Sequence, residues 1–286
     1  MLRAYKYRIY PTDEQKVLLA KTFGCCRFVY NWALKLKIEV YEHEKKSVSY
    51  KTVQDMMVNE LKKDKQWLNE VNSQALLNSI RNLDTAFKNF FRVTHAVGFP
   101  KLKSKKDRQS FQCPQHCVVD FGKGTITIPK VKDIPAVFHR KFKGTVKTVT
   151  ISMTPSRKYF ASVLVDTDIE ELPTTPIHGD TCLGIDLGIK SLAVCSDGRT
   201  FDNPKNLRRS LYRLKLLQKR LSRKKKGSAN RNKARIRVAR LHEHIANCRK
   251  DNLHKITYAL THDSQVRTIC MEDLNVKGMM QNHHLA

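Results

Sequence analysis

Positive charge is the feature that most constrains how this chain can fold. Its 286 residues include 54 Lys and Arg against 26 Asp and Glu, which gives a formal net charge of +28 at pH 7. Such an excess is self-repulsive in a compact fold unless a polyanion neutralises it. A nucleic acid is therefore the expected partner.

The sequence has no segment suited to a membrane. Its apolar runs are shorter than the ~18 residues that a membrane-spanning helix needs. Arg3, Lys6 and Arg8 interrupt the N-terminus, where a signal peptide would require an apolar stretch. We therefore expect no membrane partner and a cytoplasmic location.

The eight cysteines do not predict a disulfide framework, because none belongs to a CxxC pair. Most are expected to be reduced, buried side chains. The segment CPQHC at residues 113–117 comes nearest to a metal knuckle. A zinc site needs four ligands, and the neighbouring sequence does not supply the second half.

The N-terminal region has the pattern of a strand followed by two helices. Basic and aromatic residues alternate over residues 3–10, and Pro11 ends this strand. Thr12 and Gln15 have the spacing of a capping box, and Gly24 is the expected helix stop. The pattern predicts a helix-turn-helix unit over residues 12–43. The apolar residues of its second helix are Phe28, Val29, Trp32, Ala33, Leu36 and Val40.

Another amphipathic helix and a basic loop follow. Leu76, Ile80 and Leu83 recur at helical spacing between residues 71 and 91. Residues 98–106 then combine turn residues with lysines, which suits an ordered loop that grips phosphates, although a solvated charge run has the same composition. The loop residues assigned to nucleic-acid binding are Lys101, Lys103, Lys105 and Lys106.

The middle of the chain changes to short runs of β-forming residues. Four runs, at residues 117–121, 125–129, 146–153 and 159–166, are separated by turn signals. They predict a small antiparallel sheet or partial barrel, completed by the strand at residues 3–10. Prolines and acids then indicate a linker, which we place at 171–180.

The last region opens with two strands and a basic helical pair. Residues 182–188 and 191–195 have the strand, turn, strand pattern that opens a ribonuclease-H-like sheet. Leucines then recur over residues 207–221, and apolar residues recur over 238–260, which predicts two helices paired antiparallel. Residues 266–272 return as an apolar strand.

The helical pair carries a one-sided charge. Residues 205–250 contain 18 Lys or Arg against one acid, Glu243. Surface helices usually mix both signs, so this asymmetry indicates a contact with a nucleic-acid backbone rather than a solvated surface. The residues assigned to that contact are Arg208, Arg209, Arg213, Lys219, Arg220, Arg223, Lys224, Lys225, Lys226, Arg231, Lys233 and Arg235.

Asp186 and Glu272 are the candidate catalytic and metal-binding residues. Acidic side chains on neighbouring strands can hold divalent ions that activate water and stabilise the leaving oxygen of a phosphodiester. Carboxylates suit Mg²⁺ or Mn²⁺, because hard cations prefer oxygen ligands. Gly184 and Gly188 flank Asp186 and would allow close approach of a phosphate backbone. By itself, the Asp-x-Gly pattern also occurs in actin-like ATPases and in ordinary hairpins.

Five motifs together resemble the TnpB/OrfB family. They are YPTDEQ at residues 10–15, CRFVYNWA at 26–33, GFPKLKS at 98–104, GIDLGIKSLA at 184–193 and EDLNVKGM at 272–279. The family consists of transposon-encoded proteins, formerly called transposases, that act as RNA-guided DNA endonucleases and resemble small type V CRISPR effectors. The motifs extend over nearly the whole chain.

This resemblance implies an α+β multidomain fold. A wedge-like β domain or barrel would comprise residues 1–11 and 105–170, and a helical recognition domain residues 12–104. A RuvC-like, ribonuclease-H-like α/β domain with the basic helical hairpin would occupy residues 181–286. DNA and a guide RNA would be the partners, and their heteroduplex would lie in a basic channel while the protein reads a short flanking motif.

The resemblance also assigns Asp186 and Glu272 as the first two RuvC carboxylates. Family members continue with a zinc ribbon of two CxxC pairs and a third catalytic Asp, neither of which occurs in these 286 residues. Asp273 is a poor substitute, because alternation along a strand turns it away from Glu272. The expectation is an incomplete RuvC-like domain, truncated, with weakened metal affinity and no cleavage on its own.

Two other functions remain open at this stage. The first is a non-catalytic module that binds guide RNA or DNA, acting as a repressor or persisting as an inert remnant. The second is a nucleotide-dependent phosphotransferase of the actin-like type. That function needs a second phosphate-binding glycine turn, which the sequence after Gly188 does not supply.

Overall fold

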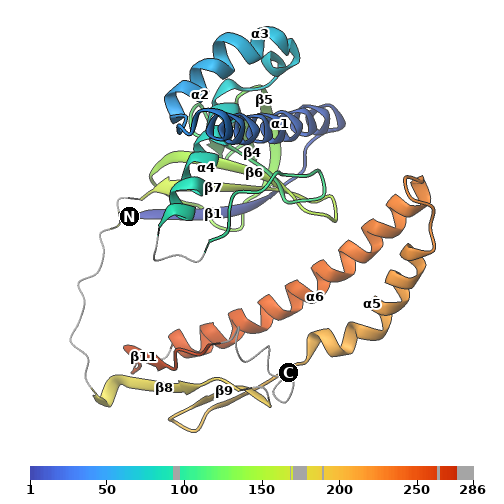
Figure 1. Ribbon diagram of the computed structural model, residues 1–286. Coiled ribbons are helices and arrows are strands. Elements are labelled where there is room, and N and C mark those ends of the chain that lie inside the picture. Colours follow the sequence, from blue (N-terminus) through green and yellow to red (C-terminus); the bar gives the residue numbers. More distant parts are fainter. Residues whose placement is uncertain (93–96, 168, 170–178, 189, 263–264, 276–286) are drawn as a thin grey trace. The chain divides into compact units, whose positions relative to one another are not determined.

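The computed structural model describes residues 1–92, 97–167, 169, 179–188, 190–262 and 265–275. The chain divides into two compact units, Met1–Glu171 and Leu172–Ala286 (Figure 1). It is a mixed α/β protein with a seven-stranded and a four-stranded sheet, in which antiparallel pairs predominate. Most of the predicted linker at 171–180 lies outside the described residues.

The first unit is built on the seven-stranded sheet. The strand order is β2-β6-β7-β1-β5-β4-β3, and every neighbouring pair is antiparallel. The strand predicted at residues 3–10 lies inside this sheet, between β7 and β5. The strands are β1 (Leu2–Ile9), β2 (Gln109–Cys113), β3 (Val118–Asp120), β4 (Thr125–Ile128), β5 (Val131–Val137), β6 (Thr145–Met153) and β7 (Tyr159–Asp166).

Alternation along β1 explains its central position. Tyr7 and Ile9 are fully buried, whereas Lys6 points to the other face, with its Nζ 4.6 Å from the centroid of the Phe160 ring. Such period-two alternation is what a strand requires when its two faces meet different surroundings. Basic residues thus occupy a central strand by packing against aromatic rings on the second face.

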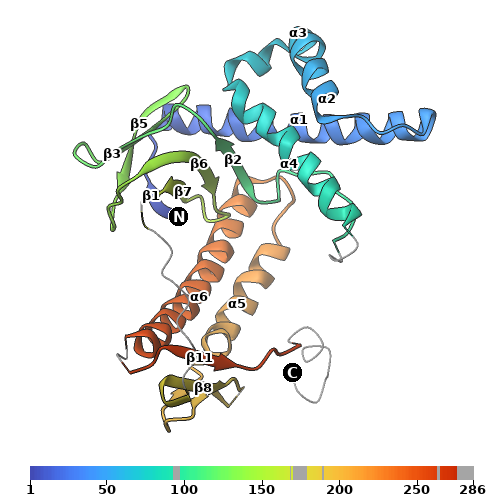
Figure 2. The same cartoon turned by 90° about the vertical axis from the view of Figure 1, so that its left-hand side faces the viewer.

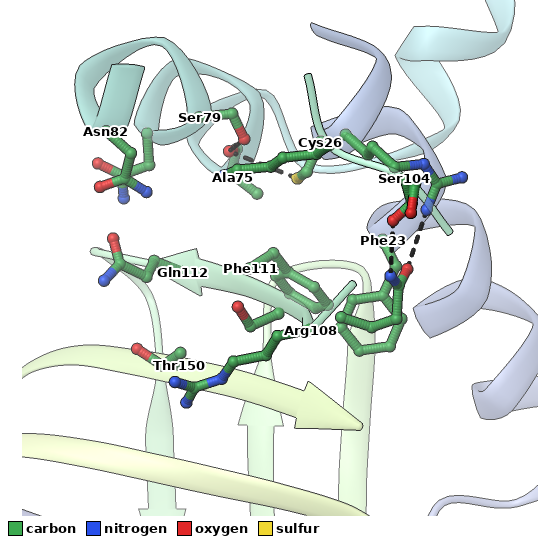
Figure 3. A pocket seen from close by; sticks show the side chains of 15 residues that line it. Phe23, Cys26, Ala75, Ser79, Asn82, Ser104, Arg108, Phe111, Gln112 and Thr150 are labelled. Carbon is green, nitrogen blue, oxygen red and sulfur yellow. Dashed lines mark hydrogen bonds between the residues drawn. The ribbon is translucent and has the colours of Figure 1, made fainter. Parts of the chain in front are cut away.

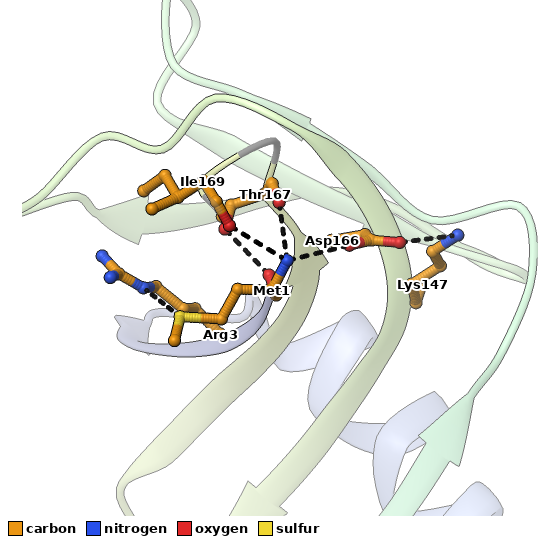
Figure 4. Close-up of polar contacts among 6 residues, drawn as sticks. All are labelled: Met1, Arg3, Lys147, Asp166, Thr167 and Ile169. Atoms are coloured by element: carbon orange, nitrogen blue, oxygen red, sulfur yellow. Dashed lines mark hydrogen bonds and ion pairs between the residues drawn. The ribbon is translucent and has the colours of Figure 1, made fainter. Parts of the chain in front are cut away.

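The first residue of the chain is bonded to the end of β7. The amino group of Met1 donates to the carbonyl oxygens of Thr167 (3.0 Å) and Ile169 (3.3 Å), and it lies 3.8 Å from Asp166 Oδ1 (Figure 4). Lys147 Nζ lies 3.3 Å from the other oxygen of Asp166. These contacts join the start of β1 to the end of β7 and the start of β6.

Helix α1 (Asp13–Glu44) begins as the sequence predicts. The Thr12 hydroxyl accepts from the Gln15 amide (3.3 Å), and the Gln15 side chain accepts from the Thr12 amide (2.9 Å), so the capping box is confirmed. This reciprocal pair satisfies two of the amides that the helix start leaves without partners.

The predicted helix stop at Gly24 is wrong. Helix α1 continues through Gly24 as one helix of 32 residues, so residues 12–43 contain no turn. The neighbouring side chains of Phe23, Cys25 and Cys26 are buried in the core. Their packing outweighs the helix-weakening effect of one glycine, which is about 1 kcal/mol.

The remaining helical segments of this unit pack against α1 and one another, and the longest of them also contacts the sheet (Figures 1 and 2). Helix α4 (Ser73–Phe91) is the predicted amphipathic helix, and its Leu76, Ile80 and Leu83 are fully buried. One hydrophobic core joins these helices to the sheet, so the predicted helical and β domains share it. The shorter segments are α2 (Tyr50–Met56), η1 (Met57–Leu61), α3 (Lys62–Asp64) and η2 (Gln66–Glu70).

The second unit has a four-stranded sheet in the order β10-β9-β8-β11. The turn η3 (Gly179–Thr181) leads into it, and its strands are β8 (Cys182–Asp186), β9 (Ser191–Cys195), β10 (Thr200–Asp202) and β11 (Thr268–Met271). The β8–β9 and β9–β10 pairs are antiparallel, whereas β11 pairs with β8 in parallel. A parallel neighbour requires a crossover connection.

Helices α5 (Asn206–Ser222) and α6 (Ala229–Thr261) form that crossover. Leu214 of α5 is buried with Leu241 and Ile245 of α6, and Leu217 packs with Val238, which confirms the antiparallel pair. The end of α6 covers the sheet, because Leu260 is buried with Leu183 and Ile185 of β8. Among the described residues, no helix is both long and apolar enough to span a membrane.

Replacing Gly24 with Ala should stabilise the first unit. A β-carbon at Gly24 would have no atom within 4 Å besides its own helix, so the added methyl group fits. The expected gain in the free energy of unfolding is about 1 kcal/mol. Urea titration followed by tryptophan fluorescence measures it selectively, because both tryptophans, Trp32 and Trp67, lie in this unit.

The matched control is Gly124→Ala. Gly124 has φ +70°, a left-handed conformation that costs an L-residue about 1 kcal/mol or more, so this variant should lose stability. A lower urea midpoint for Gly24→Ala would contradict a continuous α1.

Candidate functional site

The pairing of β8 with β11 brings the two candidate acids together. The parallel register joins Gly184 to Cys270 and Ile185 to Met271. Continued by one residue, it sets Glu272 opposite Asp186. Neighbouring strands lie about 4.8 Å apart, and residues opposite each other on parallel strands share a face.

Both acids lie on the open face of the sheet. Ile185 points the other way and is buried with Leu260 of α6, so the alternation of β8 turns Asp186 away from that helix. Asp186 and Glu272 are both exposed, and they line one shallow hollow. The other residues lining this hollow are Gly184, Ile185, Val194, Cys195, Ser196, Cys270 and Met271, and Asp273 is not among them.

Among the residues that the structure describes, none neutralises either acid. The carboxylates of Asp186 and Glu272 make no ion pair or hydrogen bond in the described part of the chain, although the Asp186 backbone pairs with Val194 of β9. The neighbouring Asp197 differs, because its hydrogen bond from the Arg199 guanidinium (Nε to Oδ2, 2.6 Å) lowers the pKa of its carboxyl. Like charges set directly opposite on neighbouring strands destabilise a sheet. An exogenous cation would relieve that repulsion.

The two glycines near Asp186 have different roles. A β-carbon at Gly188 would lie 2.9 Å from the carbonyl oxygen of Ser191, so the β8–β9 turn itself requires glycine. A β-carbon at Gly184 would come no closer than 3.6 Å to Ser196. The Ser196 side chain, which sequence reasoning missed, accepts a hydrogen bond from the Gly184 amide (3.1 Å) and fixes the floor of the hollow.

The basic hairpin presents most of its predicted cations to solvent. All of those assigned on α5 and the turn are exposed, as are Lys233 and Arg235 on α6. At the turn, a second hollow is lined by five cations and no acid. Its lining residues are Leu217, Arg220, Arg223, Lys224, Asn230, Lys233, Ala234 and Arg237. Arg237, which sequence reasoning did not assign, belongs to this set.

Arg231 is used within the protein. Its guanidinium donates to the carbonyl oxygens of Leu221 (3.1 Å) and Lys224 (2.8 Å), which are left without helical partners where α5 ends. Its amide donates to the Ser228 hydroxyl (3.1 Å), which caps α6. Arg231 therefore holds the turn in place while the surrounding lysines remain exposed.

The basic loop at 98–106 is fixed to α1 through its backbone. Asn31 donates to the Lys103 carbonyl and accepts from the Lys103 amide, both at 2.8 Å. Lys103 Nζ lies 3.8 Å from the centroid of the Tyr30 ring, and desolvation there lowers the pKa of this lysine. Lys101, Lys105 and Lys106 are exposed on the same loop.

A polar pocket lies beside this loop, between the helices and the sheet (Figure 3). Asn82 of α4 faces Gln112 of β2 across it, and Thr150 of β6 lines it as well. Arg108 also reaches its wall. Sequence reasoning missed these residues, because amides on a helix and on an unpredicted strand show no common spacing.

The CPQHC segment places its two thiols side by side. Hydrogen bonding between the thiols raises the pKa of Cys113 and lowers that of Cys117. His116 is exposed. Within the described residues, no group of three or more His, Cys, Asp or Glu side chains could hold a metal ion.

The chain matches known protein families along most of its length. Residues 162–283 match the OrfB_IS605 family model, described as "Probable transposase", and residues 1–46 match the associated model described as "Helix-turn-helix domain".

Two relatives are similar over nearly the whole chain. One, from Streptomyces pristinaespiralis, is named "Putative RNA-guided DNA endonuclease"; it is 38% identical over 289 residues, covering 99% of this chain and 70% of its own length. The other, InsQ of Escherichia coli (strain K12), has the same description; it is 34% identical over 284 residues, covering 98% and 68%. The solved Cas12f1-sgRNA-target DNA complex gives a TM-score of 0.49 at 12% identity, covering 96% of this chain and 81% of that one.

Proposed function

Because this chain belongs to the TnpB/OrfB family, we propose that it binds a guide RNA and DNA and carries part of a metal-dependent DNA endonuclease site. The observations that support this proposal are the parallel pairing of β8 and β11, which ends one residue before Asp186 and Glu272, and the hollow that both acids line. The order β10-β9-β8-β11 also fits the opening of a ribonuclease-H-like sheet. The relatives' names support the same activity.

Asp186 and Glu272 would hold the metal ion. Two unpaired carboxylates supply hard oxygen ligands of the kind that Mg²⁺ and Mn²⁺ prefer. Such an ion supplies charge stabilisation and water activation at a phosphodiester. The role of the protein residues is to fix two ligands on adjacent strands and to leave the face beside them open to a backbone.

Two carboxylates alone should bind an ion weakly. No third acid lines the hollow within the part of the chain that the structure describes. We therefore propose that these 286 residues bind nucleic acid without cleaving it unaided. A non-catalytic guide-RNA or DNA binder, acting as a roadblock or repressor, is the alternative function that this ligand set favours.

Removing either carboxylate should lower Mn²⁺ affinity by about tenfold or more, since each supplies half of the ligand set. Asp186→Ala and Glu272→Ala are compared by Mn²⁺ titration followed by electron paramagnetic resonance. Asp273→Ala is the charge-matched control, because Asp273 is adjacent but does not line the hollow. Nucleic-acid binding should survive all three changes.

The cleavage assay separates the two functions. Metal-dependent cutting of guide-matched DNA by the 286-residue chain, abolished by Asp186→Ala, would contradict the proposed lack of cleavage. Unchanged Mn²⁺ binding in both variants would instead remove the basis for the metal site.

The exposed lysines of the hairpin turn should bind phosphates. Lys224→Ala/Lys225→Ala/Lys226→Ala is expected to weaken duplex binding and to flatten the plot of log affinity against log salt, by about 0.9 for each phosphate that is no longer neutralised. Fluorescence anisotropy over a salt series measures this slope. Lys46→Ala/Lys51→Ala/Lys63→Ala removes the same charge from exposed positions in the first unit and should change the slope less. Equal slopes in both triple variants would indicate only a bulk-charge effect.

We place the reading of the flanking DNA motif at the polar pocket of the first unit. Asn82 and Gln112 carry donors and acceptors that suit base edges, and a good pairing of this kind is worth about 1–3 kcal/mol of discrimination. Asn82→Ala and Gln112→Ala should relax the sequence requirement next to the guide-matched segment. Binding to duplexes that differ only in that flank tests this, with the exposed amide variant Asn59→Ala as the control. Unaltered flank preference in both pocket variants would exclude the pocket from motif reading.

A further inference from the structure

A cluster of phenylalanines lies where the end of α4 meets the basic loop at 98–106. Phe87 and Phe91 stack with centroids 6.4 Å apart, and Phe90 meets Phe91 edge to face at 5.1 Å. Phe99, from the loop after the helix, packs edge to face on Phe87 (5.5 Å) and Phe90 (5.4 Å). Four rings from two segments thus form one continuous aromatic surface.

This surface is open to solvent. Phe91 is 72% exposed and Phe99 is 45% exposed, and Leu102 beside them in sequence is 53% exposed. Large aromatic side chains bury more apolar area than most other residues, so leaving several together in water is costly. Clustered apolar exposure of this kind marks a binding surface more often than single exposed residues do.

The inner side of the cluster is held in a fixed position. Lys37 Nζ lies 5.5 Å from the centroid of the Phe87 ring and 3.5 Å from Asp84 Oδ1, and it donates to the Val48 carbonyl (2.8 Å). The Lys37 side chain is only 11% exposed. Phe87 is thereby anchored, and Phe91 projects from a rigid base. A ring held in advance loses little conformational freedom when it stacks on a ligand.

The charge around the cluster favours an anionic ligand. Lys88 is 73% exposed, and the adjacent Arg92 and Lys101 are exposed as well. Asp84 is the acid beside them, and it is paired with Lys37 and Lys88. Aromatic faces bordered by cations suit unpaired nucleotides, because the bases stack on the rings while the phosphates meet the cations. A purely apolar protein partner would gain nothing from these cations.

We propose that this surface, the Phe91 patch (Phe87, Phe90, Phe91, Phe99, Lys88 and Arg92), stacks the unpaired bases of a single nucleic-acid strand. The inference rests on the proposed nucleic-acid binding and adds a site for unpaired segments, separate from the hairpin that contacts the backbone. Sequence identity is not read here, since every base offers a π face.

The test uses two fluorescent 15-mers with the same phosphates, oligothymidylate and its abasic analogue. The wild-type chain should bind oligothymidylate more tightly. Phe91→Ala should weaken that binding by about five- to 150-fold, the range expected for loss of one stacked base. Phe91→Leu should lose as much, because it keeps the apolar bulk without the ring, whereas Phe91→Trp should retain binding. The abasic strand should bind all four proteins equally.

Several outcomes would overturn the proposal. If Phe91→Ala and Phe91→Leu bound oligothymidylate as tightly as the wild-type chain does, base stacking at the patch would be excluded. Base stacking would also be excluded if these variants lost as much affinity for the abasic strand as for oligothymidylate. If these variants lost the binding of the wild-type chain to anionic phosphatidylserine vesicles but kept its oligothymidylate binding, the patch would be assigned to a membrane surface. Failure of the wild-type chain to bind either strand at low salt would instead contradict the underlying nucleic-acid function. Circular dichroism of each variant verifies folding.

Discussion

The parallel pairing of β11 with β8 is the contact on which the second unit depends. These strands are far apart in sequence, and a parallel pair requires a crossover between them. Helices α5 and α6 provide it, and the end of α6 buries Leu260 against β8. The same connection therefore brings β11, which Glu272 follows, beside β8, and it carries the exposed cations of the hairpin. The candidate metal ligands and the cations assigned to nucleic-acid binding thus depend on one structural element.

Charge repulsion sets a limit on how compact this element can be. The contact between the two helices buries a small apolar cluster of Leu214, Leu241 and Ile245, while many cations project from both helices. The first unit, by contrast, joins strands and helices around an extensive apolar core. A polyanion that binds the folded hairpin would add to its stability by mass action, because it does not bind the unfolded chain as well. Binding of a polyanion would therefore be coupled to the stability of the hairpin.

Local signals in the sequence predicted local structure well. The capping box of Thr12 and Gln15, the strands at residues 3–10 and 159–166, and the paired helices all depend on neighbouring residues, and the structure confirms them. The helix stop predicted at Gly24 was wrong because tertiary packing overrides the weak helix propensity of one glycine. The sequence did not predict strand β5, because Pro135 lies within it and proline ordinarily argues against a strand in the interior of a sheet. The strand is also irregular, since Asp133 has φ 49°. The register of β8 with β11 depends on a crossover of about 80 residues, so no local pattern encodes it.

The carboxylates of the candidate site differ from several others in the chain in having no cationic partner among the described residues. Several carboxylates of this cationic chain have basic partners, among them Asp84, Asp166 and Asp197. The carboxylates of Asp186 and Glu272 have no such partner within the described residues, although both line one hollow beside the β8–β11 pair. Like charges in that position oppose the pairing of the two strands. A divalent cation would convert this repulsion into a bridge between β8 and β11, so binding of the ion and closure of the sheet should favour each other. The proposed metal would then act on folding as well as on chemistry, since a ligand that binds only the paired strands stabilises them.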